Sequence, residues 1–166
     1  MDGWQILLTV LVVGLVALGL MLLIAPRFTI RLPFAVLLSI LYRKQVVGLE
    51  NIPKEQGCVV VSNHVSWIDG LLLLWMLPRN IRFVVDGGNF TNPLLKALAN
   101  QFGTILMAPN PKSIGRALKE GREGVKNGDL IGIFPEGTLT RTGQLQTFKA
   151  GYQKMLKGTD GCILPI

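Results

Sequence analysis

Apolar residues are distributed very differently at the two ends of this chain. Residues 4–25 carry no charge, and almost every position there is apolar. A helix of these 22 residues would be about 33 Å long, enough to cross a hydrocarbon core of ~30 Å. The only earlier charge is Asp2, whereas a cleaved signal peptide needs a basic start and a shorter apolar core. We therefore predict one retained transmembrane helix rather than a signal peptide or a buried core helix.

A second apolar stretch, 32–42, is too short to span a membrane. Arg31 and Arg43 flank it, so we expect it to lie along the membrane interface. Arg27, Arg31, Arg43 and Lys44 follow the predicted span, and no Lys or Arg precedes it. The positive-inside rule then places the N-terminus outside and the rest of the chain on the cytoplasmic face of the membrane.

Beyond Lys44 the pattern changes to short apolar runs separated by polar turns. Strands are predicted at 58–62, 81–85, 104–107 and 130–134, with a fifth that begins at 162 and a short β-like run at 45–49. Helices are predicted at 70–77, 93–100 and 113–127. Alternating strands and helices imply a layered α/β domain. The chain thus divides into a membrane segment, 1–42, and a domain, 43–166.

The composition follows from this division. The 166 residues are 49% hydrophobic and only 16% charged, against about 25% charged in an average domain, which excludes a disordered chain. Of the net charge of +7, most lies in the domain, which has 15 basic and nine acidic side chains. The basic residues are scattered without interleaved aromatic residues, so nucleic acid is not a predicted partner. We expect attraction to anionic lipid headgroups and acidic acyl carriers instead.

The chain has only two cysteines and one histidine, which excludes disulfide-rich folds and multi-histidine metal sites. Cys58 and Cys162 also lack zinc-ligand spacing. On the cytoplasmic face of a membrane we expect both thiols to be reduced.

The one histidine lies in a turn between a predicted strand and a predicted helix. His64 follows the strand that ends at Ser62, and Asp69 comes five residues later. Ligands bind at the carboxyl ends of strands in α/β folds, and histidine is well suited to take a proton at neutral pH. The two side chains can meet only if His64 lies in the turn and Asp69 in the first turn of the helix. A structural histidine, with Asp69 in a capping box over 66–69, is the alternative interpretation.

A second polar loop follows the predicted strand at 130–134. It brings an acid, a glycine, two hydroxyls and an arginine, in the order Pro135, Glu136, Gly137, Thr138, Leu139, Thr140, Arg141. Glu136 and Arg141 are suited to bind a polyol or a phosphate group. A Pro-Glu-Gly turn followed by a solvated loop is the alternative.

Together the two loops resemble the glycerolipid acyltransferase family, whose best-known members are the 1-acylglycerol-3-phosphate acyltransferases. Asn63, His64 and Asp69 match its catalytic NHx4D motif, and Phe134–Thr138 match its acceptor-binding FPEGT motif, with Glu136 72 residues after His64. The resemblance covers 43–166. It implies a catalytic base, His64, polarised by Asp69, and substrate binding by Asn63, Phe134, Pro135, Glu136, Gly137, Thr138 and Arg141.

The same resemblance implies a mechanism. His64 would remove the proton from a free glycerol hydroxyl, which attacks an acyl thioester directly, without a serine nucleophile. Backbone N–H groups at the start of the following helix are suited to hold the oxyanion. The acyl donor would be acyl-CoA or acyl carrier protein, and no metal or further cofactor is implied.

The chain departs from the family pattern in its second motif. That motif usually ends in an arginine that contacts the acceptor's phosphate, whereas Ala108-Pro109-Asn110 stand here. Lys112, Arg116 and Arg141 are the candidate replacements. An arginine-poor second motif resembles the bacterial 2-acylglycerophosphoethanolamine acyltransferases, which are often fused to an acyl-carrier-protein synthetase and sometimes to a lysophospholipid transporter. The helix at 4–25 would then be the last span of such a transporter.

The chain ends at 161–166, which resembles the family's fourth motif, a strand that ends in proline. Family domains continue further, so we expect an acyltransferase domain truncated at its C-terminus, with a sheet edge that a partner covers or that marks a fragment. The predicted function is transfer of a fatty acyl group to a lysophospholipid in phospholipid biosynthesis. A non-catalytic lipid-binding remnant and a thioesterase-like hydrolase are the alternatives.

Overall fold

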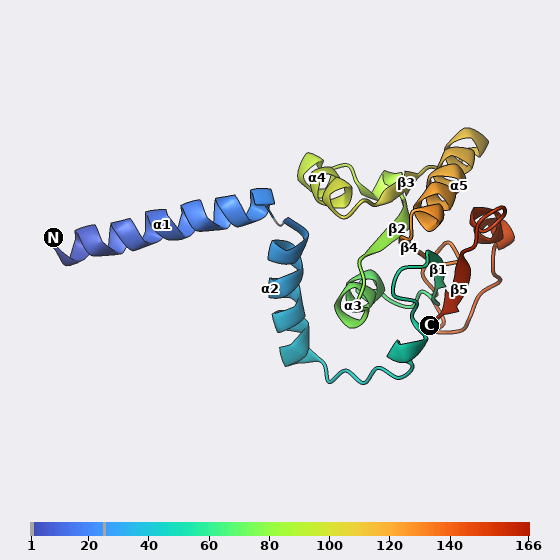
Figure 1. Ribbon diagram of the computed structural model, residues 1–166, viewed down its shortest axis with the longest axis horizontal. Helices are drawn as coiled ribbons and strands as arrows, with labels where there is room; N and C mark the ends of the chain where they lie inside the picture. Colours follow the sequence, from blue (N-terminus) through green and yellow to red (C-terminus); the bar gives the residue numbers. More distant parts are fainter. Residues whose placement is uncertain (1, 25) are drawn as a thin grey trace. The chain divides into compact units, whose positions relative to one another are not determined.

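The computed structural model describes residues 2–24 and 26–166, which form two compact units, Met1–Arg43 and Lys44–Ile166 (Figure 1). The first unit holds helices α1 (Gly3–Ile24) and α2 (Pro26–Leu41). Helix α1 is long and apolar enough to cross a membrane, and the apolar side chains of residues 4–21 are exposed. This agrees with the predicted span. Helix α2 includes most of the stretch predicted to lie at the interface, a position that stays a prediction.

The second unit is built on a five-stranded sheet in which all neighbouring strands are parallel. The strands are β1 (Cys58–Val61), β2 (Ile81–Asp86), β3 (Ile105–Met107), β4 (Leu130–Ile133) and β5 (Cys162–Pro165), in the order β3-β2-β4-β1-β5. The predicted α/β class and these five strands are confirmed. The β-like run expected at 45–49 is wrong: residues 45–48 have no regular structure, and Val47 is 85% exposed. A strand needs a neighbour to pair with, and none lies beside this segment in the sheet.

Helices cover both faces of the sheet (Figure 1). The helices of this unit are α3 (Asp69–Met76), α4 (Pro93–Gln101) and α5 (Pro111–Lys126), with short 3-10 turns η1 (Leu49–Asn51), η2 (Gly87–Asn89) and η3 (Ala150–Met155). On one face, Val59 and Ile131 pack with Ala117 of α5 and Met155 of η3. On the other face, Val60, Phe83 and Leu130 of the strands pack with Leu73 of α3. These two layers of apolar contacts hold the strands that lead to the polar loops.

The pairing of β1 with β4 places two loops side by side. Val61 lies opposite Ile133 in the parallel register, so the segment after β1 and the segment after β4 leave the sheet at the same edge. Gly132 at the centre of β4 lies opposite Phe83 of β2, and a Cβ there would come within 2.7 Å of the Phe83 ring. A glycine is therefore required for Phe83 to lie across β4.

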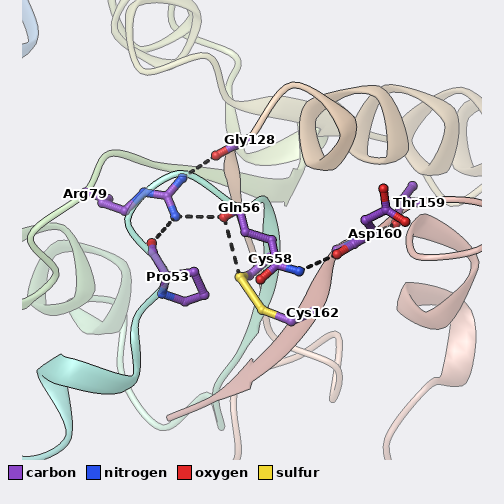
Figure 2. The surroundings of a disulfide bond; sticks show 9 residues. Pro53, Gln56, Cys58, Arg79, Gly128, Thr159, Asp160 and Cys162 are labelled. Carbon is purple, nitrogen blue, oxygen red and sulfur yellow. Dashed lines mark hydrogen bonds between the residues drawn. A yellow bond between two sulfur atoms is a disulfide. The ribbon is translucent and has the colours of Figure 1, made fainter.

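The expectation of two reduced thiols is wrong in this structure. Strand β5 pairs with β1 so that Cys162 lies opposite Cys58, with 4.6 Å between their Cα atoms, and the two residues form a disulfide (Figure 2). The residues are 104 positions apart in the sequence, so only the strand register brings them together. Figure 2 also shows Arg79 donating to the carbonyls of Pro53, Gln56 and Gly128, which fixes the chain just before β1.

We expect a non-reduced digest of the protein to contain a peptide that links Cys58 to Cys162. Because the bond closes a long loop, reduction should lower the free energy of unfolding by about 2–4 kcal/mol, measured by urea denaturation with and without reductant. The Cys58→Ser/Cys162→Ser double variant is the control and should not respond to the reductant. Quantitative alkylation of both cysteines in unreduced, denatured protein would contradict the disulfide.

Candidate active site

His64 and Asp69 meet at the carboxyl end of β1. His64 Nδ1 lies 2.9 Å from Asp69 Oδ2, and the side chains are 19% and 12% exposed. His64 lies in the loop and Asp69 opens α3, the only arrangement in which the sequence spacing allows contact. An ionised carboxylate only accepts hydrogen bonds, so Nδ1 carries the proton and Nε2 presents its lone pair. Within the described residues, Nε2 has no hydrogen-bond partner.

Asp69 also organises the loop that carries His64. The same oxygen, Oδ2, accepts hydrogen bonds from the backbone N–H groups of Val65 and Ser66, each at 2.8 Å. Ser66 Oγ accepts from the N–H of Ile68 rather than from that of Asp69, so only half of the predicted capping box forms. Asp69 therefore both caps the loop and orients His64, because the same Oδ2 atom contacts the imidazole and accepts the backbone N–H groups.

The Phe134 ring packs against one face of the His64 imidazole. The phenyl ring stacks on His64 with 4.0 Å between centroids and 12° between planes. Phe83 of β2 lies behind it, with 6.0 Å between the two phenyl centroids. Phe134 thus contacts the proposed base, a neighbour that its place in the FPEGT motif did not predict. Pro135 next to it is almost completely buried.

Glu136 is buried, with only 4% of its surface exposed. Its Oε1 accepts the backbone N–H of His64 at 2.8 Å, and its Oε2 accepts the backbone N–H of Gln146 at 3.1 Å. The carboxylate therefore joins the loop after β1 to the loop after β4. Sequence reasoning placed Glu136 at the site but had no signal for these two backbone partners.

The segment after Glu136 returns to His64. The N–H of Thr140 donates to the backbone carbonyl of His64 at 3.0 Å, so both backbone polar groups of His64 have partners. Thr138, Arg141 and Asn63 are exposed in these two loops. The structure thus brings the predicted site residues to one edge of the sheet: Asn63, Phe134, Pro135, Glu136, Gly137, Thr138 and Arg141 lie in loops that reach His64 directly or through a bonded neighbour.

Lys149 is a cation at this edge that sequence reasoning missed. Its Nζ lies 2.6 Å from the position that a Cβ of Gly137 would occupy. The backbone N–H of Lys149 donates to the carbonyl of Pro135 at 2.9 Å. Gly137 has a positive φ of 74°, the left-handed conformation that favours glycine. An exposed lysine beyond a loop carries no sequence signal of its own, since only the fold returns it to the motif.

Two of the cations considered as replacements for the second-motif arginine belong to α5, which follows β3. Arg116 of α5 donates to the carbonyl of Leu106 in β3. Strands β3 and β5 are the two outermost strands of the sheet. Lys112 lies in the first turn of the same helix. Only Arg141 is on the loop that is hydrogen-bonded to His64.

Other features of the domain do not add to this site. A cavity of about 400 Å³ lies at the opposite, amino-terminal edge of the sheet, lined by segments before β1 and β5 and after α5, and none of the predicted site residues lines it. Among residues 2–24 and 26–166, no group of three or more His, Cys, Asp or Glu side chains is placed to hold a metal ion.

The domain that carries these residues matches a known protein family. The Acyltransferase family profile matches residues 43–166, three quarters of the chain and all of the site residues. The chain belongs to the acyltransferase family. The expected resemblance is thereby confirmed at the level of the family, while the 2-acylglycerophosphoethanolamine branch stays a prediction.

Curated relatives of this acyltransferase domain share one name. A chloroplastic 1-acyl-sn-glycerol-3-phosphate acyltransferase of Brassica napus is 35% identical over 127 residues, covering 75% of this chain and 37% of the relative. One from Borreliella burgdorferi is 32% identical over 124 residues, covering 73% of this chain and 49% of the relative. This chain therefore spans half or less of the length of these relatives.

A solved acyltransferase structure has the same fold. The 1-acyl-sn-glycerophosphate acyltransferase PlsC of Thermotoga maritima matches with a TM-score of 0.63 and 25% identity, over 78% of this chain and 54% of that one. The layered α/β acyltransferase fold predicted from the sequence is thus confirmed.

The tautomer of His64 is a direct test of the site, because this chain has one histidine. At a pH where the ring is neutral, ¹⁵N NMR should show the proton on Nδ1. Asp69→Ala removes the carboxylate acceptor, so the two nitrogen signals should move toward an average of both tautomers. Asp86→Ala, which alters a carboxylate that caps Gly88 in another loop, should leave the signals unchanged. A wild-type ring protonated on Nε2 would contradict the pairing.

Proposed function

We propose that this chain transfers a fatty acyl group from acyl-CoA or acyl carrier protein to the free hydroxyl of a lysophospholipid. The observation that carries the proposal is the His64–Asp69 pair: Nδ1 is held by a carboxylate, and Nε2 is available beside the exposed residues of two motif loops. The family and the names of the relatives support the reaction class. The position of His64 between the two motif loops supports general-base catalysis of that reaction.

His64 acts as the general base. Nε2 takes the proton of the acceptor hydroxyl while that oxygen attacks the thioester carbonyl, and Asp69 stabilises the imidazolium that forms. When the tetrahedral intermediate collapses, the C–S bond breaks and the proton passes from Nε2 to the leaving thiolate. The ester and the free thiol are the products, and His64 returns to its starting state.

No serine is needed as a nucleophile in this sequence of steps. Ser62 Oγ donates to the carbonyl of Asn63, and Ser66 Oγ accepts from Ile68, so both hydroxyls serve the loop. The N–H groups of Val65 and Ser66 are bonded to Asp69, which removes them as oxyanion donors. We assign that role to the next first-turn amides of α3, those of Gly70 and Leu71.

The acceptor's charged headgroup requires a cation near the base. Arg141 and Lys149 are exposed, and both belong to the segment that is hydrogen-bonded to His64 and Pro135. We propose that they replace the missing second-motif arginine, since a guanidinium and an ammonium both bind phosphate. Asn63, Gly137 and Thr138 complete the acceptor side. The relatives' names favour 1-acylglycerol-3-phosphate as acceptor, and 2-acylglycerophosphoethanolamine is the second candidate.

Exposed apolar side chains border the proposed site, consistent with a lipid substrate. On the loop after β1, Val65 is 51% and Trp67 75% exposed; on the loop after β4, Leu145 is 67% and Phe148 42% exposed. Both loops are tied to His64 by hydrogen bonds. Large apolar groups at a polar site are costly in water unless they meet a membrane or an acyl chain. We call these four residues the apolar rim.

The orientation proposed for the chain has α1 across the membrane, the N-terminus outside and the domain on the cytoplasmic face. The four basic residues that follow α1 support it. A disulfide is more typical of an oxidising compartment and predicts the opposite side. Alkylation with a membrane-impermeant thiol reagent, with and without prior reduction in intact cells, separates the two. A fused or partner transporter or synthetase is part of the same proposal and rests on the resemblance alone.

Replacing His64 by Ala should lower the rate of acyl transfer by about 10²–10⁴, because the general base is lost. The measurement is transfer of a labelled acyl chain to a panel of lysophospholipids from both donors, with circular dichroism to show that the variant is folded. A rate equal to wild type would overturn the mechanism. Thioester hydrolysis without any acceptor would favour the thioesterase alternative, and lysolipid binding without thioester consumption would favour the non-catalytic one.

Replacing Trp67 and Leu145 together by Ser should weaken engagement of membrane-embedded substrate. We expect kcat/KM for lysophospholipid in vesicles to fall about 30-fold, because two apolar contacts are lost and each is worth on the order of 1 kcal/mol. Activity on a short-chain, water-soluble lysolipid should change less than about twofold. Ile114→Ser, an exposed apolar position on α5, is the control. Equal losses of kcat/KM on both substrates would show that the apolar rim affects the position of the base and does not contact the membrane.

A further inference from the structure

The buried carboxylate of Glu136 has partners that a substrate ligand would not need. Both oxygens accept backbone N–H groups, from His64 at 2.8 Å and from Gln146 at 3.1 Å, and the residue is 4% exposed. Among the described residues, no Lys, Arg or His side chain forms an ion pair with it. The carboxylate is therefore committed to the protein's own main chain.

The position of these bonds gives the carboxylate a specific task. The N–H of His64 is held by Glu136, and its C=O is held by the N–H of Thr140, so the catalytic backbone is fixed from both sides. Glu136 follows β4 directly, whereas Gln146 lies at the far end of the loop that carries Thr138 and Arg141. One carboxylate thus sets the distance between the proposed base and the proposed acceptor-binding loop.

We infer that Glu136 is a positioning residue that aligns His64 with the acceptor loop, and that it is not a ligand for the acceptor. The kinetic part of this inference rests on the proposed function, whereas the structural part does not. A base displaced by about 1 Å from its productive position can lose on the order of 100-fold in rate. A ligand lost from the acceptor would raise KM instead.

The test is Glu136→Gln in the full chain. A glutamine has one acceptor oxygen, so its NH₂ group faces one of the two backbone donors and leaves that donor buried without a partner. We expect kcat to fall about 10- to 100-fold while KM for the lysophospholipid changes less than about twofold, with the same factor for every acceptor headgroup. Glu123→Gln, the same chemical change on the exposed end of α5, is the matched control and should leave both parameters unchanged.

Hydrogen exchange provides a second measurement that does not depend on activity. In the wild type, the amides of His64 and Gln146 should be protected, because a buried carboxylate accepts both. In Glu136→Gln at least one of them should exchange ten or more times faster, while the amides of β1 and β4 keep their protection and show that the fold is intact.

Two results would overturn the inference. A raised KM with unchanged kcat, or an effect confined to one acceptor headgroup, would make Glu136 an acceptor ligand. Unchanged exchange at both amides in a folded variant would show that the carboxylate does not hold them. If the wild-type chain transfers no acyl group, the proposed function fails, and the exchange experiment still decides the role of Glu136.

Discussion

Strands β1 and β4 are parallel neighbours, with Val61 opposite Ile133, and the proposed site depends on this register. In a parallel pair, both chains leave the sheet at the same edge, so the segments that follow them become adjacent however far apart they are in the sequence. A shift of one residue would turn Phe134 away from His64 and move Glu136 from its backbone partners, because side chains alternate between the faces of a strand. The burial of Val59, Val60, Leu130 and Ile131 on both faces of the sheet keeps that register.

The loop of His64 is held mainly by charge-assisted hydrogen bonds rather than by packing. Asp69 accepts from the ring and from two amides, and Glu136 accepts from the backbone of His64 itself. Hydrogen bonds to ionised groups contribute about 1.5–3 kcal/mol each, roughly twice the contribution of neutral ones. A short loop that has little apolar area to bury can thus keep one conformation. The exposed Trp67 on the same loop shows that its large apolar side chain is not used for internal packing.

The elements that were predicted well have local causes. The strands at 58–61 and 130–133 are short β-branched or apolar runs between turn residues, and α5 begins at Pro111 with Asn110 as its N-cap, whose Oδ1 accepts from the N–H of Ser113. The predictions that failed depended on distant partners. Residues 45–48 have a strand-like pattern but no strand beside them, and Cys58 and Cys162 were assigned from compartment chemistry, which does not include the pairing of β1 with β5.

The sequence alone determined the α/β class and the apolar segment, because these follow from periodicity. Two motifs with restrictive spacing also led to His64 as the proposed base and Asp69 as its proposed carboxylate partner. The meeting of His64 with Asp69 was also predictable, since the short distance along the chain leaves one workable geometry. Only the tertiary structure decided what Phe134, Glu136 and Lys149 contact. Those contacts join residues that are 10 to 72 positions apart, and their partners are a ring face, backbone amides and a glycine turn. None of these partners has a signature in the order of side chains along the chain.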